Sequence, residues 1–275
     1  MTKCTLLLSV VLSIFLFPHS ISSAQNRASE VHAIVEMGQG CLIGGVQNKK
    51  WIEADAFAKK VKGAQKFSLY KLNGPAGEIA TTGIGQADCP QSSWSAKTSS
   101  KVKEGIAIAS PSWNVMPRLP RAVDLKDTTY VKIVRDVAKR GGIKMPEVKI
   151  TQAYKIDLDG DGKDEVIIAA NRYAAGGVVE WAGSSATSAG DYSFLLIRKI
   201  VGGKPQNIVV SEGFYPEGND GPLARIRKIS AIADLNGDGI MEVVFHSGYF
   251  EGSESYIIGL KRNKPIALLE CVCNI

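Results

Sequence analysis

The feature that most constrains this 275-residue chain is an acidic segment that occurs twice, each time directly before a run of apolar residues. The first copy, DLDGDGKDEVI, begins at Asp157, and the second copy, DLNGDGIMEVV, begins at Asp234. The β-branched residues in these runs favour strands. Closely spaced carboxylates repel one another unless a cation or hydrogen-bond donors compensate their charge. The pattern therefore predicts two tight turns, each leading into a strand and each requiring a counter-charge.

The spacing of the acidic residues predicts a calcium loop. Counted from the first aspartate, side-chain oxygens at positions 1, 3, 5 and 9 and a main-chain carbonyl at position 7 can converge on one hard cation, and glycine at position 6 permits the sharp turn. An EF-hand would need glutamate at position 12 and a following helix, but position 12 is Ile168 or Phe245 and a strand-like run follows. The predicted ligands are Asp157, Asp159, Asp161, Glu165 and the carbonyl of Lys163 in the first copy, and Asp234, Asn236, Asp238, Glu242 and the carbonyl of Ile240 in the second.

The two sets differ in charge, because Asn236 stands where the first set has Asp159. The count of carboxylates therefore predicts that the first set binds calcium more tightly than the second. Affinities of about 10⁻⁴–10⁻³ M are typical of extracellular calcium modules. A closed loop between paired strands leaves no open position for a substrate, so we expect both ions to be structural. The alternative is a pair of acidic turns without metal.

The acidic segments belong to a longer internal repeat. Each copy contains a strand, the acidic turn, two further strands, a Lys-Pro turn and a last strand, which is the pattern of a four-stranded antiparallel meander. The first copy also carries an insertion within residues 172–192. The predicted strands are 148–156, 165–171, 193–199 and 207–211 in the first copy, and 225–233, 242–248, 255–261 and 266–272 in the second.

The pattern D-x-[DN]-x-D-G-x-x-E followed by aliphatic residues resembles the calcium loop of FG-GAP/VCBS-type repeats, which form the blades of integrin-type β-propellers. The resemblance covers residues 148–272 in two copies. It implies two structural Ca²⁺ ions and does not imply a particular partner. Propellers are typically built from four or more blades, so a closed ring and a two-blade unit packed against the N-terminal part of the chain are both open.

The predicted fold is mainly β with minor α, and consists of two propeller-blade-like meanders preceded by a small α+β region. In this region we expect strands at 31–36, 67–72 and 105–110, a short helix at 53–61 and an exposed loop at 92–103. A longer helix is expected at 126–140, where Asp127 or Thr128 can cap it and Gly141 and Gly142 stop it. The expected divisions are a signal peptide at 1–24, a small α+β domain at 25–116, a linker and helix at 117–146, and a calcium-binding repeat domain at 147–275 with repeats at 147–211 and 224–272.

Residues 1–24 are typical of a secretory signal peptide, because Lys3 precedes an apolar run at 6–17 and small residues precede Gln25. The apolar run is too short to cross a bilayer as a helix. The sequence therefore predicts a secreted or periplasmic protein without a membrane span. The chain is basic, with a net charge of +6 at pH 7, but no dense block of Lys and Arg occurs, so we expect no nucleic-acid partner.

Four cysteines follow the predicted cleavage site, and an even number in a secreted chain indicates disulfides. Cys41 with Cys89 is the favoured pair. Cys271 and Cys273 could bond to each other, form a redox pair, or make two links back to the N-terminal part of the chain. A thiolate metal site would need further Cys or His ligands at suitable spacing, so a structural role is favoured.

Five aromatic residues fall in predicted loops at the end of the meanders opposite the acidic turns: Trp181, Phe214, Tyr215, Tyr249 and Phe250. Aromatic side chains on loops are common in recognition surfaces. We therefore expect this edge to bind a protein or a glycan, with packing over the sheet ends as the alternative.

No nucleophile elbow, H-E-x-x-H motif or phosphate loop is present in the sequence. His246 is expected to be a strand residue rather than a catalytic base. The favoured function is thus a non-catalytic binding or structural role that depends on calcium. The alternative is a secreted or periplasmic hydrolase that acts on glycans through a carboxylate pair on the aromatic edge, such as Glu180 with Glu251.

Overall fold

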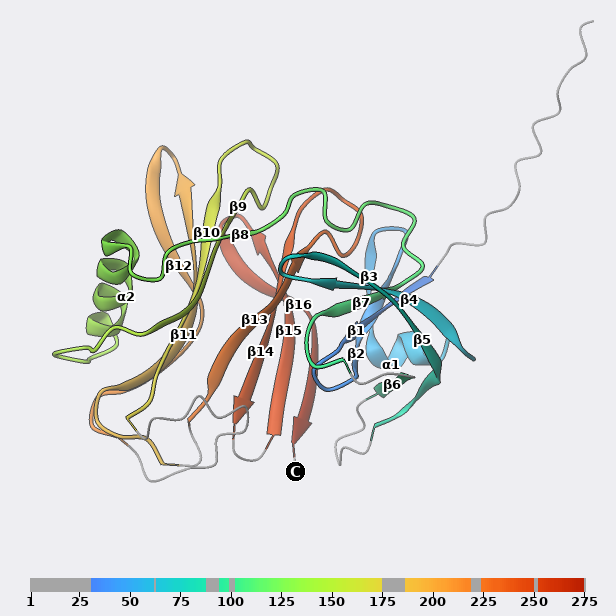
Figure 1. Cartoon of the computed structure of the whole chain (residues 1–275), viewed down its shortest axis with the longest axis horizontal. Helices are drawn as coiled ribbons and strands as arrows, with labels where there is room; N and C mark the ends of the chain where they lie inside the picture. The colour runs from blue at the N-terminus through green and yellow to red at the C-terminus, as the bar shows by residue number, and fades with distance from the viewer. Residues whose placement is uncertain are drawn as a thin grey trace, which may run out of the picture.

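The computed structural model describes residues 31–61, 63–87, 94–98, 102–174, 186–218, 224–249 and 252–274. The predicted signal peptide at 1–24 lies outside these residues. Strands β1 to β16 and helices α1 and α2 make the described chain mainly β, as predicted, and all its paired strands are antiparallel. Figure 1 shows four layers side by side: α2, a first C-terminal sheet, a second C-terminal sheet and an N-terminal barrel.

The N-terminal layer is a closed barrel of short strands. Its ring order is β1-β7-β4-β5-β6-β2, the pairing of β1 with β2 closes the ring, and β3 continues outward from β2. A closed ring leaves few exposed strand edges. The bounds are Val31–Glu36 (β1), Cys41–Gln47 (β2), Lys50–Glu53 (β3), Gln65–Lys71 (β4), Gly74–Gln86 (β5), Trp94–Thr98 (β6) and Ile106–Ala109 (β7).

The predicted short helix at 53–61 is present as α1 (Ala54–Ala58), and the strands of this layer close into a β-barrel. One prediction for this layer needs correction. The predicted exposed loop at 92–103 contains β6 instead. Trp94 and Ala96 are two residues apart and both pack into the barrel interior. The alternation of apolar and polar residues in β6 covers five residues and is flanked by serines, so the sequence pattern is too short to predict a strand.

The two C-terminal layers are meanders with strand orders β12-β11-β10-β9-β8 and β13-β14-β15-β16. Each of the eight strands predicted in this half overlaps a strand of the structure. The bounds of the first sheet are Arg121–Ala122 (β8), Ile150–Ile156 (β9), Glu165–Arg172 (β10), Asp191–Val201 (β11) and Lys204–Tyr215 (β12). Those of the second sheet are Ile226–Ala233 (β13), Glu242–Tyr249 (β14), Gly252–Lys261 (β15) and Lys264–Asn274 (β16).

Helix α2 (Thr128–Arg140) covers the outer face of the first sheet. Asp127 caps its first turn, because the Asp127 side chain accepts a hydrogen bond of 2.7 Å from the Thr129 N–H. The helix ends before Gly141, as predicted. At 13 residues it is the longer helix, and no helix in the described part of the chain is long and apolar enough to cross a membrane.

Each C-terminal sheet is covered on both faces. One core joins α2 to the first sheet, a second joins the two sheets, and a third joins the second sheet to the outside of the barrel. A fourth core fills the barrel. Helix α2 and the barrel therefore bury the two outer sheet faces that further blades would cover in a ring, and the strands described here do not close into a propeller.

The free edge of β13 is closed by side chains of the first sheet rather than by a strand. Three alternate residues along the first half of this edge each have their main-chain N–H and C=O bonded to one side chain, at distances between 2.5 and 3.0 Å. The pairs are Gln152 with Ile229, Asn171 with Arg227, and the Tyr173 hydroxyl with Arg225. These bonds fix the position of the second sheet relative to the first.

The favoured pairing of Cys41 with Cys89 is wrong, because Cys41 on β2 is bonded to Cys271 on β16. This bond also excludes a bridge between Cys271 and Cys273. Strand β16 packs against β2 in the third core, which brings the two cysteines together although 230 residues separate them in sequence. Cys273 is disulfide-bonded as well, and Cys89 lies outside the described residues.

Candidate metal centre

The two acidic segments form the β9–β10 and β13–β14 turns, at the upper end of neighbouring sheets in Figure 1. We call residues 157–165 the first loop and residues 234–242 the second loop. A hydrogen bond of 2.7 Å from the Met241 N–H to the Leu158 carbonyl joins them directly. The two candidate sites therefore lie side by side rather than at distant points of the molecule.

Both loops are folded by the same internal hydrogen bonds. The aspartate at position 1 accepts from the N–H groups at positions 4 and 6, at 2.7 and 3.0 Å in the first loop and 2.7 and 2.9 Å in the second. The glutamate at position 9 accepts from the N–H at position 2, at 2.8 Å in each loop. The position-4 residues, Gly160 and Gly237, have a φ of 76°, which favours glycine because a Cβ is strained in this region.

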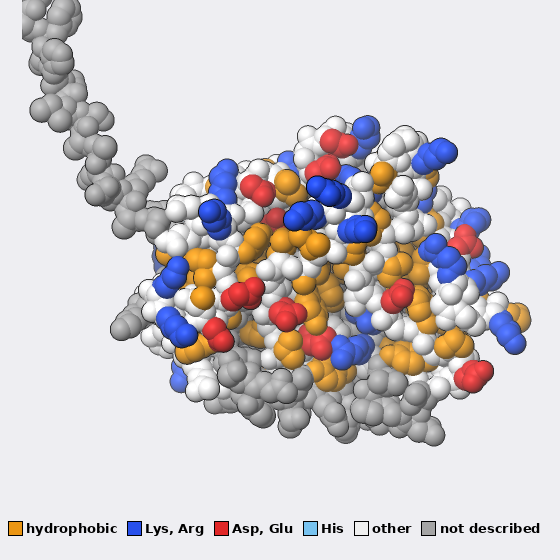
Figure 2. Space-filling view, turned by 180° about the vertical axis from the view of Figure 1, so that it is seen from behind, with side chains coloured by type: hydrophobic (Ala, Val, Ile, Leu, Met, Phe, Trp, Pro, Cys, Tyr) orange, Lys and Arg blue, Asp and Glu red, His pale blue; other side chains and the backbone are white. Residues whose placement is uncertain are grey.

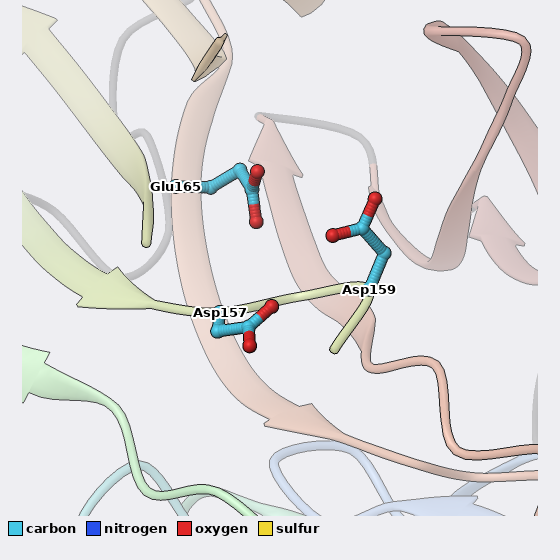
Figure 3. A group of neighbouring side chains, drawn as sticks. All are labelled: Asp157, Asp159 and Glu165. Carbon is cyan, nitrogen blue, oxygen red and sulfur yellow. The ribbon is translucent and has the colours of Figure 1, made fainter. Parts of the chain in front are cut away.

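The first loop brings three of its predicted ligands together. One carboxylate oxygen from each of Asp157, Asp159 and Glu165 lies within 4.8 Å of the other two. Figure 3 shows the three side chains around a common space between the loop and the start of β10. Asp161 is not in this group. Its exposed carboxylate accepts from the Lys163 N–H at 2.8 Å, and this bond holds the pKa of Asp161 below its usual value. Ligand roles for Asp161 and for the Lys163 carbonyl remain predictions.

A lysine that the motif does not contain lies against the first loop. Lys199, near the end of β11, donates from Nζ to Asp159 at 2.8 Å and to Glu165 at 2.7 Å. Burial lowers the pKa of Lys199, but the two carboxylates outweigh this effect and raise it overall. Sequence reasoning missed Lys199, although β11 was predicted to end there and to pair with the strand that Glu165 begins. The first loop thus carries a compensating cation from its own chain.

The second loop is more buried, and the described part of the chain places no equivalent cation against it. Asp234, Asn236 and Glu242 are 4%, 5% and 3% exposed. Among the residues whose placement is described, no Lys or Arg forms an ion pair with Asp234, Asp238 or Glu242. The repeat equivalent of Lys199 is Lys261, which is exposed.

The protonation equilibria of the second loop reflect this environment. Burial is the main cause of the rise in the Glu242 pKa to about 9; the charges of Asp238 and Asp234 add to the rise, and the hydrogen bond from the Leu235 N–H opposes it. Burial also raises the pKa of Asp234. The Asn236 amide donates to the Asp238 carboxylate at 3.0 Å, and its side-chain oxygen accepts from the Asp238 N–H, also at 3.0 Å. An amide oxygen has two lone pairs, so one stays available for a cation. Asn236 stands where the first loop has Asp159, so the second loop has one carboxylate fewer. Among the described residues, only the first loop brings three acidic ligand atoms within 4.8 Å of one another.

The predicted recognition edge is largely packed where it is described. Phe214 packs in the core beneath α2, with its ring centroid 5.7 Å from that of Phe194. Tyr249 is 8% exposed, and the Arg225 guanidinium covers its ring at 4.5 Å. Tyr215 is half-buried. Trp181 and Phe250 lie outside the described residues. The geometry of these three aromatics thus favours the packing alternative.

The surface offers no single strongly charged field on the side shown in Figure 2. Hydrophobic side chains form a band across this face, with Lys and Arg gathered above it and Asp and Glu among and below it (Figure 2). A large field of one sign is what attracts nucleic acid or other polyions. The charge distribution on this face therefore does not favour a polyionic partner.

Two cavities bear on the hydrolase alternative. One, of about 410 Å³, lies between β9, β10 and β13, and its lining contains no acidic residue. The other, of about 540 Å³, lies beside α2, and its one carboxylate, Asp136, is paired with Lys132. Neither has the pair of free carboxylates that glycoside hydrolysis requires. Glu180 and Glu251 lie outside the described residues, and His246 is on β14, where burial lowers its pKa to about 4.

The chemistry open to the loops follows from their ligand atoms. All the side-chain donors are oxygens, which suits a hard divalent cation such as Ca²⁺. Burial of unpaired carboxylates, as in the second loop, is unfavourable without a counter-charge. The residues present therefore fit a bound calcium ion. Comparisons with protein-family models, with curated proteins and with solved structures found no match to this chain.

Proposed function

We propose that this protein is a secreted or periplasmic calcium-binding protein with a non-catalytic binding or structural role. The observation that carries the proposal is the second loop, in which the buried carboxylates of Asp234 and Glu242 have no basic partner in the described structure and are also repelled by the charge of Asp238. Removing such groups from water without a counter-ion is strongly unfavourable. A divalent cation would supply the missing charge, and the resemblance of both loops to FG-GAP/VCBS-type repeats supports the same assignment.

Two ions would be held, one in each loop. The ligands of the first are the carboxylates of Asp157, Asp159, Asp161 and Glu165 with the carbonyl of Lys163. Those of the second are Asp234, Asn236, Asp238 and Glu242 with the carbonyl of Ile240. Each ion would tie the end of one strand to the start of the next, since position 1 follows β9 or β13 and position 9 begins β10 or β14. The proposed role is therefore to stabilise the fold and the register of each sheet.

The two loops are expected to differ in affinity, in the order opposite to the one that the count of carboxylates predicts. Calcium bound in the first loop must displace the Lys199 ammonium from Asp159 and Glu165. The second loop has no lysine to displace in the described structure, but below the Glu242 pKa of about 9 calcium must displace a proton from this ligand. We infer that the second loop fills first as the calcium concentration rises when Glu242 is ionised, and that its affinity falls as the pH is lowered.

Calorimetric titration of chelator-stripped protein with CaCl₂ tests this proposal. The expected result is two bound ions, with the tighter one lost in Asp234→Asn and the weaker one lost in Asp157→Asn. Asp136→Asn is a matched control, because it removes an exposed carboxylate on α2 that is distant in sequence from both loops. Titrations without binding heat, supported by metal analysis that finds no calcium, would refute the proposal.

The hydrolase alternative gains no support from the two cavities, because neither contains a free carboxylate pair. A protein or glycan partner on the edge opposite the loops remains a prediction. Pull-down experiments with Trp181→Ala and Tyr215→Ala test it, since loss of a captured glycan or protein would indicate that these aromatics contact it. Unchanged capture would assign the edge to packing alone.

A further inference from the structure

The segment 113–118, which connects the barrel to the first sheet, contacts both acidic loops; we call it the bridging segment. It belongs to the green chain that crosses the top of the molecule in Figure 1. Its first residue, Trp113, donates from the indole N–H to the Asp234 carbonyl at 2.8 Å. The Val115 carbonyl accepts from the Asp234 N–H, also at 2.8 Å. The second loop is thus held on both sides of its first ligand residue.

Arg118, the last residue of the bridging segment, joins the two loops. Its Nε donates to the Asp157 carbonyl at 2.6 Å, and one terminal nitrogen donates to the Leu158 carbonyl at 3.3 Å. The same terminal nitrogen donates to the Gly239 carbonyl at 2.6 Å. One half-buried guanidinium therefore binds main-chain oxygens at positions 1 and 2 of the first loop and position 6 of the second. The planar fork of arginine can hold several acceptors at fixed angles, which a lysine ammonium on a flexible stem cannot reproduce.

The loops also contact each other beneath Arg118. The Met241 N–H bonds to the Leu158 carbonyl at 2.7 Å, so this carbonyl accepts from the second loop and from Arg118. The side chains of Leu158 and Met241 are 4% and 3% exposed and belong to the core between the sheets. Packed cores resist small displacements, so a shift in one loop main chain must be accommodated by the other.

We propose that Arg118 is a positioning residue that couples the two loops, so that calcium bound in one loop raises the affinity of the other. The inference rests on the proposed function. Ordering the main chain of one loop around an ion fixes the Arg118 guanidinium, and the other loop then has less conformational freedom left to lose. Such coupling is reciprocal, because each loop must change the affinity of the other by the same factor.

Calorimetric titration of chelator-stripped variants measures that factor. The calcium affinity of the second loop is measured in the unmodified chain and in Asp157→Asn, which disables the first loop. The calcium affinity of the first loop is measured in the unmodified chain and in Asp234→Asn, which disables the second loop. The expected factor is about 5-fold or more, and equal in the two directions. Both comparisons are then repeated in Arg118→Ala, where the factor should fall towards one.

Two further variants separate geometry from charge. Arg118→Lys keeps the charge but cannot hold three carbonyls, so it should lose the coupling as Arg118→Ala does. Arg121→Ala removes a neighbouring arginine that pairs with Asp164 of the first loop at 2.7 Å and is not hydrogen-bonded to the second loop. It should leave the factor unchanged. Thermal unfolding in chelator shows whether each variant is folded.

The outcomes are distinguishable. Two calcium ions that bind independently in the unmodified chain would overturn the coupling while leaving the proposed function in place. A factor that survives in Arg118→Ala would overturn the role of Arg118, even if that variant unfolds at a lower temperature. Absence of calcium binding in every variant would overturn the proposed function, and the coupling with it.

Discussion

Lys199 shows how one side chain can change the chemistry of an acidic loop. The first loop has more carboxylates than the second, yet the Lys199 ammonium already binds Asp159 and Glu165. Lys199 follows Glu165 by 34 residues, and pairing between β10 and β11 brings the two together. The number of acidic ligands in the motif therefore does not give the net charge of the loop, because it omits cations supplied from elsewhere in the chain.

Replacing Lys199 with methionine should strengthen calcium binding in the first loop and weaken the calcium-free fold. Hydrogen bonds to charged groups contribute about 1.5–3 kcal/mol, so relieving this competition should raise the affinity of the first loop roughly tenfold or more. Without calcium, Glu165 would lose its partner while 2% exposed, at a cost of about 3 kcal/mol in the free energy of unfolding.

Calcium titration and urea unfolding in chelator measure the two effects. Lys261→Met, at the equivalent exposed position of β15, is the matched control and should change neither. Equal calcium affinities for the first loop in Lys199→Met and in the unmodified chain would contradict the competition.

His246 predicts a pH dependence that does not involve the acidic loops. Burial and, to a smaller extent, the charge of Lys228 lower the pKa of His246 to about 4 against the opposing effect of Glu254. An unfolded histidine titrates near 6.5, so between pH 6.5 and 4 the unfolded state binds a proton that the folded state does not. As the pH is lowered from 6.5 to 4, the free energy of unfolding should therefore decrease, by about 1–3 kcal/mol at pH 4.

Urea unfolding in chelator at pH 7, 5.5 and 4.5, compared with His246→Gln, isolates this contribution. The carboxylates titrate in both proteins, so the difference between the two curves reports on the histidine. The variant should lose less stability than the unmodified chain as the pH falls. Parallel curves would show that His246 carries no such penalty.

At the scale of elements, the edge of β13 shows how a strand edge can be closed without another strand. Asn171 supplies both an acceptor for the Arg227 N–H and a donor to the Arg227 carbonyl, each at 2.9 Å. Gln152 does the same for Ile229. Unpaired strand edges are prone to intermolecular pairing. These side-chain amides therefore stabilise the junction between the sheets and protect the edge.

The substitution Asn171→Ala should destabilise the protein more than the substitution of an asparagine on the surface. It leaves the two main-chain groups of buried Arg227 without partners, at about 1–3 kcal/mol for each group, so the free energy of unfolding should fall by about 2–6 kcal/mol. Asn207→Ala, which removes an amide bonded to Arg198 on the β11–β12 hairpin, should cost less than about 1 kcal/mol. Equal losses in urea unfolding would contradict a special role for the β13 edge.

Elements that depend on neighbouring residues could be predicted from the sequence. The repeat strands and α2 follow from local periodicity and capping, and Asp127 caps the helix as expected. The acidic loops are equally local, since residues within nine positions fold each one. Strand β6, Lys199 and Arg118 could not be predicted in the same way. Their positions depend on contacts with residues far along the chain, which no local pattern encodes.

At the scale of the whole molecule, two stacked sheets lie between a helix and a barrel. This arrangement resolves the question left open by the repeat, because α2 and the barrel cover the outer sheet faces. The disulfide between Cys41 and Cys271 fastens the first half of the chain to its last strand. The preference for pairing with Cys89 failed because proximity in sequence said nothing about the order of the layers.

The double variant Cys41→Ser with Cys271→Ser should lose much of the stability that this link provides. A bond that closes a loop of 230 residues on its own restricts the unfolded chain by about 5.5 kcal/mol on the chain-entropy model, and the disulfide at Cys273, which stays in the double variant, makes the expected loss smaller. Urea unfolding of the oxidised protein and of the double variant measures the difference. A loss below about 1 kcal/mol would show that the third core and the disulfide at Cys273 hold β16 in place without the Cys41–Cys271 bond.

The central claim is that calcium binds both acidic loops and stabilises the whole fold. With affinities of about 10⁻⁴–10⁻³ M, 5 mM CaCl₂ should add about 1–2 kcal/mol for each loop, which raises the unfolding temperature by about 5 °C or more in a chain of this size. The most direct measurement is thermal unfolding in calcium and in chelator, for the unmodified chain and for Asp157→Asn with Asp234→Asn. We predict a clear rise with calcium that the double variant loses; the same unfolding temperature in calcium and in chelator for the unmodified chain would contradict the claim.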